Sequence, residues 1–192
     1  MSKSQPSGFA PKLSLGVSGV ITPLPPLTLV LGGARSGKSR YAEGLVDRHP
    51  GRRTYLATAE VLDDEMAARV KTHRARRDSD WKTVEEPLAL ADALKAETEQ
   101  GAAVLVDCLT LWLGNLLGKD RDVDAEIDGL VVALGQFGGP VVFVSNEVGQ
   151  GIVPDNALAR RFRDLAGILH QRLAEQADHV VFVTAGLPQI LK

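Results

Sequence analysis

The sequence predicts an α/β fold in which a mostly parallel central sheet carries helices on both faces. Three features lead to this prediction. Short runs of Val, Leu and Phe recur without polar alternation, as expected for strands buried on both faces. These runs alternate with segments of helical periodicity, which is the arrangement of parallel strands joined by helices. A glycine-rich segment at residues 32–37 joins the first apolar run to the first helical segment. We find no internal repeat and no boundary of a second domain.

The elements follow in order along the chain. The expected strands are residues 27–31, 54–57, 104–106, 141–145 and 180–184, with 81–84 as a possible edge strand. The expected helices begin near Lys38, Asp63, Leu88, Asp122 and Asp155. The last helix is the clearest, with Asp155 or Asn156 as its N-cap. Its apolar residues recur at three- and four-residue steps and predict one stripe: Leu158, Phe162, Leu165, Leu169 and Leu173.

The glycine-rich segment carries the most informative motif. Residues 32–39 read Gly32, Gly33, Ala34, Arg35, Ser36, Gly37, Lys38 and Ser39 and fit the phosphate-binding pattern G-x-x-x-x-G-K-[ST]. The glycines allow a tight turn whose N–H groups face one concavity, and the following helix adds its positive end. Lys38 is expected to reach the β- and γ-phosphates, and Ser39 to bind Mg²⁺. A chance glycine-rich turn is the alternative, which the strand–loop–helix context disfavours. The sequence therefore predicts a site for a nucleoside triphosphate.

The bulk composition is that of an ordinary globular domain. The chain has 192 residues, of which 44% are hydrophobic and 24% charged. A net charge of −2 gives no indication of a nucleic-acid partner. Cys108 is the single cysteine, so it forms no internal disulfide, and it fits a reducing, cytoplasmic compartment. We interpret it as a buried apolar residue rather than a nucleophile.

The N-terminal segment is rich in Ser, Gly and Pro. We expect residues 1–26 to form a mobile tail and residues 27–192 to form one nucleotide-binding domain. No stretch approaches the roughly 18 apolar residues of a membrane span. A signal peptide is rejected because its removal would damage the strand that leads into the phosphate loop.

A second element of the site is expected at Asp107, directly after the apolar run 104–106. A carboxylate at the end of a buried strand can hold Mg²⁺ directly or through water. The alternative is that Asp107 caps the segment 108–117.

Residues 63–77 predict a helix with acidic residues in its first turn and cations at its end. His73 shares a face with Met66 and Arg69. Arginines around it are suited to phosphate oxygens and would keep the imidazole neutral, so that it can attack a phosphorus atom. The alternative is a solvated basic helix end. Asn146 and Glu147 follow another strand and either face a substrate or belong to an ordinary connection.

Five segments together resemble one family. They are the phosphate loop with Arg40, residues 63–74, residues 81–86, residues 145–154 and residues 156–167. The chain from about Thr28 onward is similar to the bifunctional adenosylcobinamide kinase / adenosylcobinamide-phosphate guanylyltransferase family. The tail to Pro26 is a departure from the family pattern.

The resemblance implies a RecA-like P-loop NTPase fold, a trimer, and two reactions of cobalamin nucleotide-loop assembly. One phosphorylates adenosylcobinamide with ATP or GTP, and the other moves GMP from GTP onto the adenosylcobinamide phosphate. It implies that His73 carries the GMP. It also implies nucleotide contacts from the phosphate loop and from Ala57, Thr58, Ala59, Arg74, Ala75, Arg76, Arg77, Glu85 and Asp107.

Two other functions remain open from the residues alone. A simple P-loop kinase would use Lys38 and leave His73 incidental. A nucleotide-dependent switch protein would need segments that respond to the γ-phosphate, and the sequence offers none that is recognisable.

Overall fold

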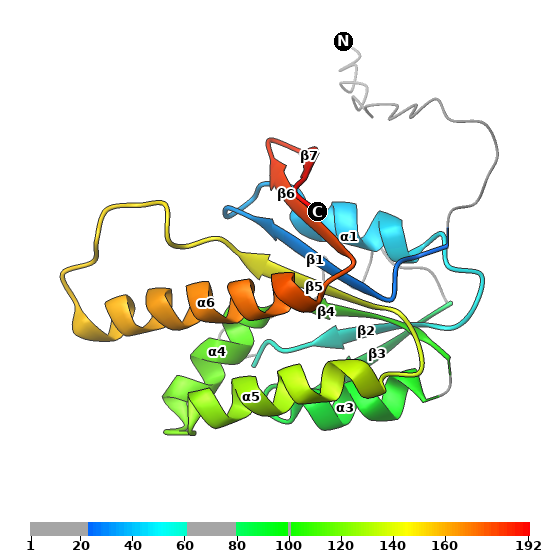
Figure 1. Ribbon diagram of the computed structural model, residues 1–192, viewed down its shortest axis with the longest axis horizontal. Coiled ribbons are helices and arrows are strands. Elements are labelled where there is room, and N and C mark those ends of the chain that lie inside the picture. The colour runs from blue at the N-terminus through cyan, green and yellow to red at the C-terminus, as the bar shows by residue number, and fades with distance from the viewer. Residues whose placement is uncertain (1–22, 61–79, 100) are drawn as a thin grey trace, which may run out of the picture.

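The computed structural model describes residues 23–60, 80–99 and 101–192, and its centre is a seven-stranded sheet of order β3-β2-β4-β5-β1-β6-β7 (Figure 1). The strands are β1 Leu27–Gly32, β2 Arg53–Ala57, β3 Trp81–Glu85, β4 Ala103–Asp107, β5 Val141–Asn146, β6 His179–Thr184 and β7 Leu187–Ile190. The helices are α1 Lys38–Val46, α3 Leu90–Thr98, α4 Leu109–Gly118, α5 Val123–Ala133 and α6 Ala157–Gln176, with a 3₁₀ turn at Leu134–Gln136.

The six strands expected from the sequence are confirmed, and all six are parallel. β1 lies between β5 and β6, so its apolar run is covered from both sides and both faces. Leu29 and Val30 have no exposed surface, although they point to opposite faces. β3 is the edge strand and is only partly buried. The carboxyl ends of all the parallel strands meet at one edge of the sheet, which we call the carboxyl edge.

The two faces of the sheet are covered unequally. Helices α3, α4, α5 and α6 pack on one face around a large apolar cluster that includes Trp112 and Phe143 (Figure 1). Among the described elements, α1 is the helix on the other face, where Ala42 and Val46 pack on Val30 and Val144. The expected α/β class is therefore confirmed.

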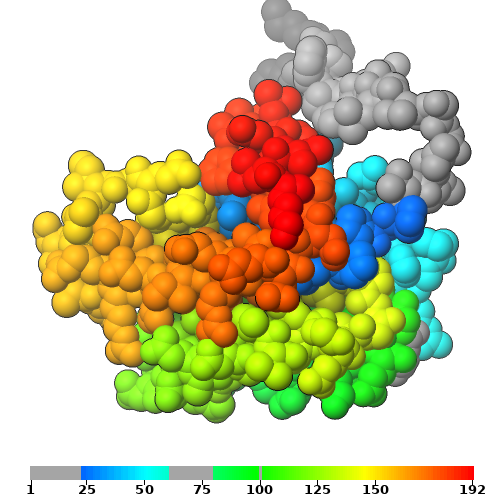
Figure 2. All heavy atoms as spheres, viewed as in Figure 1, coloured from blue at the N-terminus to red at the C-terminus, as the bar shows by residue number. Residues whose placement is uncertain are grey.

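Helix α6 begins as the sequence indicated. Asn156, and not Asp155, is the N-cap: its side chain accepts hydrogen bonds from the N–H groups of Leu158 (2.8 Å) and Ala159 (3.2 Å). Of the predicted stripe, Leu165, Leu169 and Leu173 are buried, but Leu158 is 60% exposed. The first turn of α6 and the loop before it, yellow in Figure 2, lie at one end of the molecule, which explains this exposure.

Other boundaries differ from expectation. Helix α4 was not among the expected helices. Asp107 does not cap it, because Asp107 ends β4 and Cys108 occupies the N-cap position. Helix α3 begins two residues later than expected, after Glu86 accepts hydrogen bonds from the N–H groups of Leu88 and Ala89. Asp122 caps α5 as expected, by accepting from Ala125 N. The helix expected near Asp63 lies outside the described residues.

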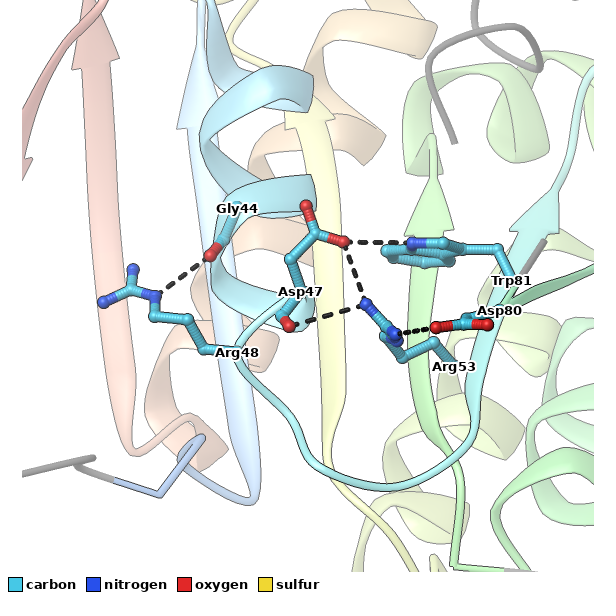
Figure 3. Close-up of polar contacts among 6 residues, drawn as sticks. All are labelled: Gly44, Asp47, Arg48, Arg53, Asp80 and Trp81. Atoms are coloured by element: carbon cyan, nitrogen blue, oxygen red, sulfur yellow. Dashed lines mark hydrogen bonds and ion pairs between the residues drawn. The ribbon is translucent and has the colours of Figure 1, made fainter. Parts of the chain in front are cut away.

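The amino ends of β2 and β3 are joined to α1 by a charged network (Figure 3). Arg53 binds Asp80 at 3.0 Å and Asp47 at 3.4 Å, and Trp81 Nε1 donates to Asp47 at 3.0 Å. The Arg53 guanidinium lies over the Trp81 ring at 6.0 Å from its centre. This network fastens the edge strand at the end of the sheet opposite to the carboxyl edge. In the described part of the chain, no helix is long and apolar enough to cross a membrane.

Candidate nucleotide-binding site

The phosphate loop occupies residues 33–37, between β1 and α1. Gly37 is the N-cap of α1 and has a φ of 96°, a left-handed conformation that favours glycine. Arg35 also has a positive φ, 56°, and its side chain is exposed. Ser36 N and Lys38 Nζ both donate to the Gly33 carbonyl, each at 3.2 Å. The loop is therefore closed on itself at the N-terminus of a helix, where backbone N–H groups without intrahelical partners can bind an anion.

Lys38 is 8% exposed, at the base of the loop. Burial lowers the pKa of its ammonium group, and negative charge acts in the opposite direction, from Cys108 when its thiol is ionised and from Asp107. The Cys108 thiol is itself buried; burial, followed by the nearby Asp107, raises its pKa, so it is uncharged near neutral pH. Asp107 is therefore the anion that stabilises the Lys38 charge before a phosphate binds.

Asp107 lies on β4, with β5 between it and the P-loop strand β1. Tyr55 donates a hydrogen bond to Asp107 Oδ2 at 3.2 Å. Ala57 pairs in register with Asp107 on one side and with Glu85 on the other, so these three residues form a row across β4, β2 and β3. The structure thus brings together three of the predicted nucleotide contacts at the carboxyl edge.

Thr58 follows β2 and has no exposed surface. Its hydroxyl donates to the Cys108 carbonyl at 2.8 Å and accepts from Cys108 N at 2.9 Å. The Thr58 carbonyl accepts from Asn115 Nδ2 on α4 at 2.7 Å. The Thr58 side chain therefore holds the chain next to Asp107. Ala59, after it, is partly exposed.

The donor set fits Mg²⁺. Ser39 stands on the first turn of α1 and Asp107 at the end of β4, which supply one hydroxyl and one carboxylate oxygen. Mg²⁺ prefers such oxygen ligands and completes its shell with water and phosphate oxygens rather than with an all-protein cage. Consistently, the described ranges contain no group of three or more His, Cys, Asp or Glu that could hold a metal alone.

The remaining predicted residues divide into two sets. Ala34 and Arg40 are exposed beside the loop, and Ser36 Oγ is buried without a hydrogen-bond partner in the described part of the chain. His73 and the run Arg74, Ala75, Arg76 and Arg77 lie outside the described residues, so their predicted roles stay predictions.

The loop after β5 also reaches the site. Glu147 N donates to the Gly32 carbonyl at 3.1 Å, and Asn146 Nδ2 donates to Thr110 Oγ1 at 2.9 Å. Sequence reasoning missed His170, which is 6% exposed on α6. Its Nε2 lies 2.7 Å from Ser145 Oγ, and its Nδ1 lies 3.8 Å from Glu147 Oε2. Burial lowers the pKa of His170, and Glu147 opposes that effect. The one indication in the sequence was that His170 directly follows Leu169, which belongs to the predicted apolar stripe of this helix.

A parallel sheet whose first strand ends in a closed glycine loop, with a buried lysine and a carboxylate two strands away, defines a P-loop nucleotide-binding protein. A family model for cobinamide kinase / cobinamide phosphate guanyltransferase matches residues 28–191, and the chain belongs to this family.

Relatives agree with this assignment. The bifunctional adenosylcobalamin biosynthesis protein CobP of Pseudomonas aeruginosa is 52% identical over 166 residues, which cover 85% of this chain and 96% of that protein. The bifunctional adenosylcobalamin biosynthesis protein CobU of Escherichia coli is 43% identical over 176 residues, with 84% and 97% covered.

Solved structures are similar in fold at low identity. An ATPase from a bacterial type III secretion system has a TM-score of 0.55 at 12% identity, covering 85% of this chain and 56% of that one. The PH0250 protein of Pyrococcus horikoshii has a TM-score of 0.54 at 11% identity, with 90% and 88% covered. The flagellar accessory protein FlaH of Methanocaldococcus jannaschii has a TM-score of 0.51 at 13% identity, with 88% and 80% covered. These likenesses concern the fold alone.

Proposed function

We propose that the protein phosphorylates adenosylcobinamide with ATP or GTP and then transfers GMP from GTP to the adenosylcobinamide phosphate. The family to which it belongs supports both activities. The observation that carries the proposal is the closed phosphate loop, with Lys38 bound to the Gly33 carbonyl and Asp107 at the same edge of the sheet.

In the kinase step, the acceptor hydroxyl oxygen attacks the γ-phosphorus. A new P–O bond forms, the bond to the β,γ-bridging oxygen breaks, and the hydroxyl proton is released. Such a transfer depends mainly on positioning and on neutralisation of phosphate charge. The loop amides and the Lys38 ammonium supply that neutralisation. Ser39 and Asp107 would hold Mg²⁺, which would supply further positive charge against the phosphates.

In the guanylyl step, an imidazole nitrogen of His73 attacks the α-phosphorus of GTP and pyrophosphate leaves. A phosphate oxygen of the acceptor then attacks the same phosphorus and releases the histidine. The role of His73 rests on the family resemblance, and we propose Arg74, Ala75, Arg76, Arg77, Glu85 and the row at the carboxyl edge as contacts of the guanine nucleotide. The proposed reactant partners are adenosylcobinamide and its phosphate.

A labelling experiment tests this proposal. The protein is incubated with GTP labelled at the α-phosphate, denatured, and assayed for protein-bound label that is stable to base and labile to acid, as a phosphoramidate is. We expect such label on the parent. His73→Ala should lose the label and the GMP transfer but keep a measurable kinase reaction, because direct phosphoryl transfer needs no histidine nucleophile.

His49→Ala and His179→Ala are matched controls, since the chain has four histidines. Both variants should keep the label. Label on the His73→Ala protein would place the intermediate elsewhere. A parent that takes no label but phosphorylates adenosylcobinamide would be a simple kinase, and one that binds GTP without either reaction would favour the switch protein.

We also propose that the protein works as a homotrimer in the cytoplasm. Light scattering after gel filtration should give about three times the chain mass of 20.5 kDa. A single-chain mass at micromolar concentration would contradict the trimer.

A further inference from the structure

The C-terminal hairpin of β6 and β7 packs against the phosphate loop. The hairpin closes with two residues, Ala185 and Gly186, between the paired Thr184 and Leu187. Ala185 has a φ of 52° and Gly186 a φ of 81°. Two left-handed residues in succession are the signature of a type I′ turn, which matches the twist of the flanking strands. Because β6 lies beside β1 and runs parallel to it, this turn stands at the carboxyl edge, next to the phosphate loop.

The contact between turn and loop is made by backbone atoms. Gly186 N donates a hydrogen bond to the Ser36 carbonyl at 2.7 Å. A Cβ atom built on Gly37 would lie 3.1 Å from Gly186 Cα, and one built on Gly32 would lie 2.5 Å from the Val183 carbonyl oxygen. Side chains at either loop glycine would therefore separate the loop from β6 and its turn. Two glycines of the phosphate motif thus serve packing against the hairpin as well as chain reversal.

The hydrogen bond has a directional consequence for the loop. In a trans peptide unit, the C=O and the N–H point in opposite directions. The bond from Gly186 turns the Ser36 carbonyl outward, so the N–H of Gly37 faces away from the hairpin. The bond from Glu147 N holds the Gly32 carbonyl toward β5, on the other side of β1, so the loop is also fixed at its first residue. The Gly37 N–H, one donor of the phosphate-binding loop, is therefore oriented before any nucleotide binds.

We propose that the turn at Ala185–Gly186 positions the phosphate loop through the bond from Gly186 N to the Ser36 carbonyl, so that the C-terminal hairpin is part of the nucleotide site. This inference rests on the proposed function, because it assumes that GTP binds at the loop. Gly186 acts through the loop and is a positioning residue, not a catalytic one.

The test compares Gly186→Val with Gly186→Asn. A Cβ on Gly186 meets no atom within 4 Å, so both side chains have room. Valine disfavours a left-handed φ strongly, whereas asparagine tolerates it. We expect Gly186→Val to raise the Kd for GTP about tenfold, because one hydrogen bond would no longer hold the loop in place before GTP binds. Gly186→Asn should restore affinity to within about twofold of the parent.

Gly101→Val is the matched control. Gly101 also has a left-handed φ, 71°, and open space around it, but it lies at the amino end of β4, away from the loop. We expect this variant to lower the melting temperature and leave the Kd for GTP unchanged. All Kd values are measured by calorimetry at a temperature where circular dichroism shows the variant folded.

The outcomes are separable. A Kd for Gly186→Val within twofold of the parent, or an equal rise in Gly101→Val, would overturn the inference. If Gly186→Val does not fold, Gly186→Ala replaces it, with a smaller rise expected in the same direction and an unchanged Kd overturning the inference. A parent protein that does not bind GTP would contradict the proposed function instead.

Discussion

Replacing Thr58 by valine removes one hydroxyl from the carboxyl edge and changes little else. The two side chains have nearly the same shape, and Thr58 is fully buried. The hydroxyl bridges Cys108 N (2.9 Å) and the Cys108 carbonyl (2.8 Å). The carbonyl keeps a second donor, because Trp112 N also binds it at 3.2 Å. The Thr58→Val change therefore leaves one buried N–H group without a partner and removes one further bond.

The loss of stability can be calculated from these two changes in hydrogen bonding. A buried N–H without a partner costs about 1–3 kcal/mol, and the loss of one net hydrogen bond about 0.5–1.5 kcal/mol. We expect Thr58→Val to lower the free energy of unfolding by about 3 kcal/mol, which corresponds to a melting temperature lower by about 6–12 °C for a domain of this size. Because Cys108 follows Asp107 directly, the Mg²⁺-dependent part of GTP affinity should fall as well.

Urea unfolding measures the stability change, and Thr58→Ser is the control. Serine keeps the hydroxyl and lacks one methyl group, so the free energy of unfolding of Thr58→Ser should be lower by only about 1 kcal/mol. The difference between the two variants separates the hydrogen bonds from packing. If Thr58→Val proved as stable as Thr58→Ser, the hydroxyl would not hold the Cys108 backbone and our reasoning would be refuted.

Two further predictions concern charge. Lys38→Ala should weaken GTP binding at least tenfold, because a charge-assisted contact of about 1.5–3 kcal/mol is lost. Calorimetry measures the Kd for GTP. Unchanged kinase turnover in this variant would contradict the assignment of Lys38 to the phosphate-binding site. Burial lowers the pKa of His170 in the fold, so the neutral ring is favoured and the unfolded chain binds a proton first. The contribution of His170 to stability should be complete above about pH 6.5 and should fall as the pH drops below it. Urea unfolding at pH 7.5 and 5.5 measures this change. An equal loss of stability in His170→Gln would assign the pH dependence to other groups.

Much of the fold was predictable because the strands of a parallel sheet are buried on both faces and therefore have continuous apolar sequences. Residues 27–31 and 141–145 lack polar alternation and were predicted as buried strands, and the phosphate motif predicted the loop between the first strand and the first helix. The position of Asp107 at the end of β4 was predictable for the same reason, since it follows a run buried on both sides. Asn156 was recognised by the chemistry of the N-cap, which is local in sequence.

Features that depend on distant partners were not predictable. Helix α4 is apolar on nearly every side and shows no single stripe, because it is buried between the sheet and α6. Strand β7 contains Pro188, which argues against a strand in general and is tolerated only at an edge. The roles of Thr58 and His170 rest on Cys108 and Ser145, which are 50 and 25 residues away along the chain. No local pattern contains such a pair.

The position of β1 between β5 and β6 determines when the nucleotide site can exist during synthesis. The phosphate loop lies near the start of the domain, whereas the strands on either side of β1 and the turn at Gly186 come from its second half and its end. At about 5–20 residues per second, roughly 8–30 s separate the translation of residue 32 from that of residue 184. Until residue 146 is made, the nascent chain contains Lys38 but neither neighbouring strand of β1, and until residue 184 is made it still lacks β6. Chains that lack β6 would therefore neither sequester nor consume GTP, and nucleotide binding would report that β6 and the turn at Gly186 have been made.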